Sequence, residues 1–307
     1  MSCNSPVRVW RSKDGRSSET GKWSVTFRRS EGYEDKALLV PCGKCAGCLL
    51  DRARSWSVRC VLEASMYSHN CFITLTYAPE YLPPHASLVK EHFTLFMKRL
   101  RKKFGDGIRF FQCGEYGDLH GRPHYHACLF NFDFPDKEFF FKSENGALLY
   151  RSKSLEKLWP YGLSTIGAVT AATAAYVAGY VLKKVEAKID YGNRLPEYIN
   201  MSRKPGIGRT WFEKYAADVY PFDRVVLNEN VDVRPPRYFD DLFDQICPEV
   251  MQEVRSTRMQ RARDRLLEVF PDYSYFDQCH GLDPDSDSKF RKELYLRHKL
   301  KEKKRGF

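Results

Sequence analysis

The sequence contains no long apolar run and no hydrophobic segment near its first residue. Its longest weakly polar stretch, residues 167–182, is rich in Ala and Thr and falls short of the roughly 18 to 20 apolar residues that a membrane span requires. Residues 1–10 carry charge but no apolar core of a secretory signal. We therefore expect a cytoplasmic protein without a membrane segment.

Two further absences narrow the class of protein. No G-x-x-x-x-G-K-[ST] phosphate loop occurs, which argues against a fused helicase. Ten cysteines in 307 residues, three of them within residues 42–48, suit a reducing compartment better than a disulfide framework. Hydrophobic residues make up 43% and charged residues 29% of the chain, a balance that predicts a globular protein.

Positive charge is in excess. Fifty Lys and Arg face 39 Asp and Glu, which gives a net charge of +11 and favours nucleic acid as the partner. Two basic stretches are candidates for contact with DNA phosphates, with a solvated surface as the alternative for each. They are residues 289–305 and a group at the end of a predicted helix, which comprises Lys98, Arg99, Arg101, Lys102 and Lys103.

The hydrophobic pattern predicts an α+β fold. Short β-branched and aromatic runs predict strands at residues 23–27, 72–77, 108–113 and 124–132, and apolar residues at helical spacing predict helices at 42–63, 88–103, 155–159, 168–188 and 248–270. The strands at 108–113 and 124–132 are expected to pair antiparallel because a Gly-rich connector joins them. Strands that alternate with helices in this way are typical of α+β proteins.

Changes in composition suggest three regions. We expect a peripheral basic arm over residues 1–40, a central domain over 41–200 with a Cys-rich element at 42–60, and a mainly helical C-terminal extension over 201–307.

His124 and His126 flank a single residue of a predicted strand. Their side chains therefore point to the same face of the sheet. Glu115 would come alongside them if the connector folds the two strands into a hairpin. Two imidazoles and a carboxylate can hold a divalent ion with open positions, which would polarise a phosphate oxygen. The alternative is that the two histidines merely share a polar face of the sheet.

Tyr176 and Tyr180 are four residues apart on a predicted helix and so share one face, with Lys183 and Lys184 a turn further along. A phenol attacks phosphorus effectively when a metal or an ammonium group stabilises the phenolate or the transition state. Two equivalent tyrosines allow two successive transesterifications. The alternative is a tyrosine pair that serves packing, with lysines that complement the helix dipole.

Cys42, Cys45 and Cys48 form a C-x-x-C-x-x-C motif. Thiolates at this spacing can share one tetrahedral zinc ion if a fourth ligand comes from elsewhere in the chain. The candidates for that ligand are Cys60, Cys71 and Cys3. An iron–sulfur cluster, or three ordinary thiols in a tight turn, are the alternatives.

With these residues in view, the sequence resembles the HUH endonucleases that initiate rolling-circle replication, and among them the replication initiators of gokushovirus-like microviruses. Three motifs carry the resemblance in the order typical of that family: FITLTY at 72–77, GEYGDLHGRPHYHACLF at 114–130 and YVAGYVLKK at 176–184. PCGKCAGCLLDRARSW at 41–56 and SRKPGIGRTWFEKY at 202–215 resemble the microviral branch. The resemblance covers roughly residues 40–216.

The resemblance implies a ferredoxin-like HUH fold, in which helices flank a central antiparallel sheet, and a bound Mg or Mn ion. The metal ligands that it implies are His124, His126 and Glu115, with Asp118 or His120 as alternatives to Glu115. It assigns nucleophilic attack to Tyr176 and Tyr180, and charge stabilisation to Lys183 and Lys184.

The implied activity is strand nicking at a single-stranded viral origin in the cytoplasm of a host bacterium. Attack by a tyrosine leaves a 5′-phosphotyrosine and a free 3′-hydroxyl, which a host polymerase extends while a host helicase unwinds the duplex. The second tyrosine repeats the cut, and the released 3′-hydroxyl closes a circle. The alternatives are a plasmid initiator, relaxase or transposase of the same superfamily, or a non-catalytic zinc and nucleic-acid binding protein whose tyrosines stack on bases.

Overall fold

The structure is a computed structural model that describes Cys3 and residues 5–16, 23–117, 121–143, 146–186, 191–220 and 222–269. Contacts within the chain divide it into two compact units, Met1–Asp51 with Thr257–Phe307, and Arg52–Ser256. The basic stretch at 289–305 lies outside the described residues.

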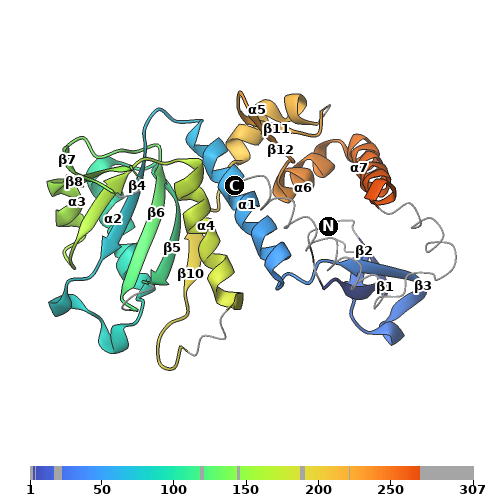
Figure 1. Cartoon of the computed structure of the whole chain (residues 1–307), viewed down its shortest axis with the longest axis horizontal. Coiled ribbons are helices and arrows are strands. Elements are labelled where there is room, and N and C mark those ends of the chain that lie inside the picture. Colours follow the sequence, from blue (N-terminus) through green and yellow to red (C-terminus); the bar gives the residue numbers. More distant parts are fainter. Residues whose placement is uncertain are drawn as a thin grey trace. The chain divides into compact units, whose positions relative to one another are not determined.

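Strands and helices alternate along the described chain (Figure 1). The strands are β1 (Val7–Arg16), β2 (Trp23–Thr26), β3 (Gly32–Val40), β4 (Asn70–Thr76), β5 (Arg109–Tyr116), β6 (Pro123–Phe130), β7 (Lys137–Lys142), β8 (Leu148–Ser152), β9 (Ser164–Gly167), β10 (Tyr198–Met201), β11 (Val225–Asn228) and β12 (Val231–Val233). The α-helices are α1 (Ala46–Ala64), α2 (Lys90–Phe104), α3 (Lys153–Leu158), α4 (Ala171–Glu186), α5 (Arg209–Val219), α6 (Arg237–Ile246) and α7 (Pro248–Val269). Short 3-10 turns occur at Arg29–Glu31, Pro79–Tyr81 and Pro84–Ala86.

The first unit contains a small antiparallel sheet in the order β2-β1-β3. The sequence predicted only β2 of these three strands. β1 and β3 are long and mostly polar, so the alternation that marks a half-buried strand is weak in both.

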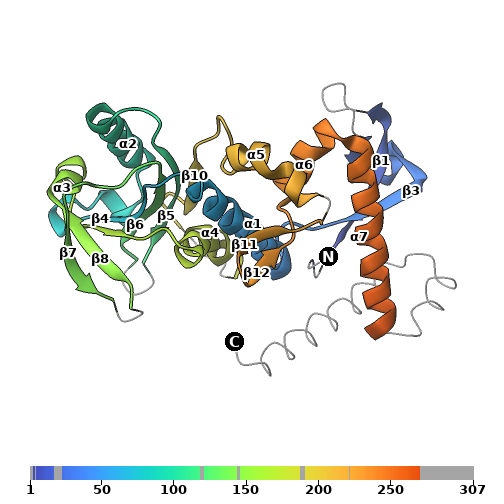
Figure 2. The ribbon, with the colours of Figure 1, turned by 90° about the horizontal axis from the view of Figure 1, so that it is seen from above.

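The second unit is built on a seven-stranded sheet in the order β10-β5-β6-β4-β9-β8-β7. Every neighbouring pair of strands is antiparallel. Helix α2 lies on one face of this sheet and α4 on the other, as the two views in Figure 1 and Figure 2 agree. The predicted α+β class is therefore confirmed, and the strands and helices expected around the motifs are present as β4, β5, β6, α2 and α4.

The alternation of β6 explains why both faces of the sheet are covered. Tyr125, Ala127 and Leu129 belong to the core beneath α2, together with Phe96 of that helix. Cys128 and Phe130 point the other way and pack with small residues of α4, namely Ala174 and Ala178, beside Val177. Small side chains allow α4 to approach the sheet closely, which places its exposed residues near the polar ends of the strands.

Helix α1 shares the α4 face of the sheet through Ala53 and Cys60. Its other side, with Val58 and Leu62, forms a third core with α5, α6 and the start of α7. The described part of residues 201–269 is thus mainly helical, apart from the β11–β12 hairpin. The expected boundary at residue 200 falls within β10, and the expected domain division stays a prediction.

Within the described ranges, every helix is too short or too polar to cross a membrane.

Candidate functional site

The β5–β6 hairpin brings the candidate metal ligands to one end of the sheet. In its register Glu115 lies directly opposite His124, and the predicted antiparallel pairing of the two strands is confirmed. The N–H of Gly117 donates to the carbonyl oxygen of Arg122 at 2.9 Å, which closes the base of the connector. Both histidines and Glu115 lie on the face of the sheet that α4 covers.

A cluster of three side chains forms the centre of the candidate site. His126 Nε2 lies 2.7 Å from Glu115 Oε1, and these residues are only 6% and 3% exposed. The hydroxyl of Tyr176 donates to the same carboxylate oxygen at 3.3 Å. Its ring meets the imidazole of His126 edge-on, with centroids 5.1 Å apart. The helix of the candidate nucleophiles therefore lies on the histidine face of the sheet.

The second nitrogen of each imidazole has a hydrogen-bond partner. His124 Nδ1 lies 2.7 Å from the carbonyl oxygen of Arg122, which can only accept, so Nδ1 carries the hydrogen and Nε2 keeps its lone pair. Burial lowers the pKa of His124 below its ordinary value, which favours the neutral form that binds metals. His126 Nδ1 lies 3.0 Å from Thr74 Oγ1. Partners of this kind orient ligating histidines in metal sites.

The donor set fits a divalent ion. Glu115 Oε2 is buried and makes no hydrogen bond to any residue that the structure describes, so this oxygen has unused acceptor capacity in a site that is costly to leave unsatisfied. The ligand atoms of His124, His126 and Glu115 do not all lie within 4.8 Å of one another, a spacing that only a cysteine group reaches among the described residues. His124 is half-buried at the open edge of the cluster, and its ring centroid lies 6.3 Å from that of His126.

Some candidate residues lie outside this cluster. Tyr180, Lys183 and Lys184 belong to α4, but the structure does not describe their side chains. Asp118 and His120 lie outside the described residues.

The basic group at the end of α2 lies on the opposite face of the sheet from the histidines. Two of its members have partners within the protein: Arg101 donates to the carbonyl oxygen of Ile108 at 2.7 Å, and Lys103 donates to Ser154 Oγ at 2.9 Å. The structure thus does not bring this basic group to the candidate site.

Thr74 and Arg122 are site residues that sequence reasoning missed. The alternation of FITLTY places Thr74 and Thr76 on one face of β4, but only the register of β4 against β6 reveals that Thr74 lies opposite His126. Arg122 acts through its backbone carbonyl, for which no side-chain signal exists.

Comparisons with known proteins point to one family. Residues 70–185, from β4 to α4, match a family of replication-associated proteins of the ORF2 type. The chain is 36% identical over 260 residues to replication-associated protein ORF2 of Spiroplasma virus 4, an alignment that covers 78% of this chain and 79% of that protein. It is 35% identical over 221 residues to replication-associated protein VP4 of Bdellovibrio phage phiMH2K, with 69% and 70% covered.

Replication-associated protein ORF4 of Chlamydia phage 1 is 31% identical over 240 residues, which cover 75% of this chain and 59% of that protein. No solved structure gives a significant match. The fold and the site define an α+β protein with a histidine, carboxylate and tyrosine cluster on one face of an antiparallel sheet. The chain belongs to the family of microvirus replication-associated proteins, which confirms the resemblance found in its sequence.

Proposed function

We propose that this protein is a replication initiator that nicks single-stranded viral origin DNA by tyrosine transesterification and later rejoins the strand. The observation that carries this proposal is the meeting of Tyr176, His126 and Glu115, in which one carboxylate oxygen lies 2.7 Å from an imidazole and 3.3 Å from a phenol. A phosphate bound beside Glu115 would therefore lie within reach of the Tyr176 hydroxyl.

The topology of the sheet supports an HUH endonuclease. The strand order β5-β6-β4-β9, with α2 between β4 and β5 in sequence, is the order of a ferredoxin-like fold in which consecutive β-α-β strands lie on either side of a third strand. Helix α4 follows β9 directly and covers the face that carries the histidines.

His124, His126 and Glu115 would hold the Mg or Mn ion. When bound, this ion would neutralise charge on the scissile phosphate and polarise its phosphorus–oxygen bonds. The buried and unpartnered Oε2 of Glu115 supports the assignment, as does the lone pair left on His124 Nε2. Thr74 and the carbonyl of Arg122 would keep the imidazoles oriented.

The chemistry needs no nucleotide cofactor. The Tyr176 oxygen forms a bond to phosphorus while the bond from phosphorus to the 3′-oxygen breaks, and the phenolic proton ends on that 3′-oxygen. The products are a 5′-phosphotyrosine and a 3′-hydroxyl, and the reverse attack by a 3′-hydroxyl rejoins the strand. Tyr180, one helical turn on, would be the second nucleophile, and Lys183 and Lys184 would stabilise developing charge.

Because the sequence has no phosphate loop, unwinding would fall to a host helicase, and a host polymerase would extend the 3′-hydroxyl in the cytoplasm of the bacterium.

A covalent adduct assay tests the proposal. Wild-type protein is incubated with end-labelled single-stranded origin DNA and Mn²⁺, and the adduct is resolved on a denaturing gel. We expect Tyr176→Phe combined with Tyr180→Phe to abolish the adduct, because a phenyl ring has no nucleophilic oxygen. Tyr81→Phe is the matched control, since Tyr81 is 52% exposed against 47% for Tyr176 and contacts Tyr161 instead of the cluster.

Two outcomes oppose the proposal. Adduct formation that persists in the double variant would place the nucleophile elsewhere. Tight binding of the DNA by wild-type protein with no adduct in Mn²⁺ or Mg²⁺ would favour a non-catalytic nucleic-acid binding protein.

A further inference from the structure

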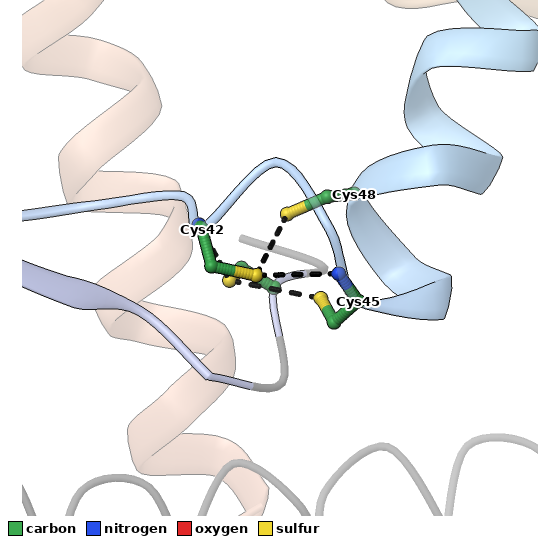
Figure 3. A group of neighbouring side chains, drawn as sticks. Cys42, Cys45 and Cys48 are labelled. Carbon is green, nitrogen blue, oxygen red and sulfur yellow. Dashed lines mark hydrogen bonds between the residues drawn. The ribbon is translucent and has the colours of Figure 1, made fainter. Parts of the chain in front are cut away.

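Four cysteines that the nicking chemistry does not use converge in the first unit. Cys3 precedes β1, Cys42 follows β3, Cys45 lies just before α1 and Cys48 is in its first turn. Their sulfur atoms all lie within 4.8 Å of one another. Figure 3 shows the labelled side chains of Cys42, Cys45 and Cys48, whose sulfur atoms point toward one another from the loop and the start of the helix.

The spacing of the sulfur atoms is that of a tetrahedral metal site. Cys42 Sγ lies 4.0 Å from Cys48 Sγ, and Cys45 Sγ lies 3.8 Å from Cys3 Sγ. Four sulfur atoms at about 2.3 Å from a zinc ion stand about 3.8 Å from one another at the corners of a tetrahedron. The cysteines are free thiols, because sulfur atoms joined in a disulfide would be about 2.05 Å apart.

Backbone donors already point at two of these sulfur atoms. The N–H of Cys42 donates to Cys3 Sγ at 3.2 Å, and the N–H of Cys45 donates to Cys42 Sγ at 3.3 Å. Hydrogen bonds of this kind stabilise thiolates and orient them toward a metal. An N–H that reaches back three residues from Cys45 to Cys42 also fixes the turn that the C-x-x-C spacing requires.

The small sheet has little hydrophobic core of its own. Among the described residues up to Asp51, the buried apolar side chains are those of Cys3, Val9 and Leu49. A three-stranded sheet with so few buried apolar groups needs another source of stability, and a structural metal is a common one. Because the site does not preexist in an unfolded chain, the free energy of metal binding adds directly to the free energy of folding.

We propose that Cys3, Cys42, Cys45 and Cys48 bind one structural Zn²⁺ ion. Four protein thiolates fill the tetrahedron and leave no open position, so the ion holds the chain together and takes no part in catalysis. It ties the residues before β1 to the loop after β3 and to the start of α1. The site thereby closes both ends of the small sheet.

Cys3 is the fourth ligand that the sequence left open. The other two candidates are core residues of the second unit: Cys60 packs in the core beneath α4, and Cys71 packs in the core beneath α2. Burial raises the pKa of each of these thiols well above its ordinary value, which keeps them neutral. The position of Cys3 close to the first residue of the chain hides its relation to the C-x-x-C-x-x-C motif, 39 residues away.

Metal analysis of the full chain tests the proposal. The protein is purified with zinc in the growth medium and without chelator, and zinc, iron and labile sulfide are measured per chain. We expect one zinc ion, no iron, and a loss of zinc affinity of at least about tenfold in Cys3→Ser, because one of four thiolates is removed. Cys247→Ser is the matched control, since Cys247 is half-buried and lies outside the cluster.

The same measurement in a His124→Ala, His126→Ala variant separates this site from the proposed nicking site. We expect the zinc to remain in that variant, whether or not the histidines hold a metal in the wild-type protein. Zinc that is lost with the histidines, zinc that persists at full affinity in Cys3→Ser, or iron with labile sulfide would each overturn the proposal.

A second measurement covers the case in which Cys3→Ser does not fold. Co²⁺ is exchanged into the wild-type protein, and its absorption spectrum is expected to show the thiolate charge-transfer and tetrahedral bands of a four-sulfur site. Treatment of the zinc protein with a chelator is expected to speed amide hydrogen exchange in β1 and β3 and leave β4 and β6 unchanged. An octahedral Co²⁺ spectrum, or exchange in β1 that ignores the chelator, contradicts the proposal.

Discussion

The two histidines of the candidate site differ in what orients them. The carbonyl of Arg122 can only accept from His124 Nδ1, so that ring has one tautomer. The hydroxyl of Thr74 can either donate to or accept from His126 Nδ1. His126 can therefore donate from Nε2 to Glu115, as a metal-free pair would, and can also offer the Nε2 lone pair to a metal. Thr74 is the residue that makes both states available.

This dual role makes Thr74 a positioning residue with a testable signature. We expect Thr74→Val to raise the Mn²⁺ concentration for half-maximal cleavage about 10- to 100-fold, as loss of a partner to a ligating histidine does. The cleavage rate at saturating Mn²⁺ should change little, and Thr74→Ser should restore the wild-type dependence.

Thr76→Val is the control, because Thr76 lies on the same face of β4, opposite His124, and both substitutions exchange a hydroxyl for a methyl. An equal change in both valine variants would assign the effect to the strand and not to the hydrogen bond. A change in the saturated rate alone would contradict a positioning role.

Among the secondary-structure elements, those with strong local signals were predictable from the sequence. The β5–β6 pair has β-branched and aromatic residues around a Gly-rich connector, and α2 ends at Gly105, whose φ of +95° suits glycine. The helical spacing of the tyrosines predicted α4. What the sequence did not determine was the face of the sheet that each helix covers, because that choice depends on contacts between residues far apart in the chain.

The missed strands show the same limit. β10 is four residues long and joins the sheet only by pairing with β5, about 85 residues earlier, so it has no local partner to reveal it. The β7–β8 hairpin had a usable signal in the aromatic run at 139–141 and the Asn-Gly pair at 145–146. For the candidate site, the motif residues could be predicted, whereas Thr74 and the carbonyl of Arg122 depended on register and backbone geometry.

Helix α1 illustrates how a buried charge can join distant elements. Glu63 is fully buried, forms an ion pair with Arg109 of β5, and accepts from the backbone N–H of Gly208 at 2.6 Å just before α5. One carboxylate thus links a helix, the central sheet and the C-terminal helices of the second unit.

We expect Glu63→Gln to lower the free energy of unfolding by about 3 to 5 kcal/mol, because Arg109 would keep a largely buried charge without its partner. Urea denaturation followed by circular dichroism measures the change. Glu213→Gln removes an exposed carboxylate from its pair with Arg209 and should cost no more than about 0.5 kcal/mol. Losses of similar size in the two variants would mean that the buried pair has no special role.

For the whole molecule, the net charge of +11 bears on how DNA is held. The candidate site itself is compact and nearly neutral in ligands, so the affinity for a polyanion must come from basic residues elsewhere on the surface. Lys98 and Lys102 are exposed on α2, unlike their neighbours Arg101 and Lys103, which have partners within the protein. They are therefore the members of the basic group that remain available to phosphates.

Salt dependence separates local contacts from the general effect of charge. We expect the logarithm of the affinity for single-stranded DNA to fall linearly with the logarithm of salt concentration, and the slope to weaken by about 1.4 in Lys98→Gln combined with Lys102→Gln, since each phosphate contact contributes about 0.7. Fluorescence anisotropy at several salt concentrations measures it. Lys153→Gln combined with Lys214→Gln removes the same charge from exposed positions on α3 and α5 and should leave the slope nearly unchanged. If both double variants weaken the slope alike, DNA responds to the overall charge of the protein and the end of α2 is an ordinary solvated surface.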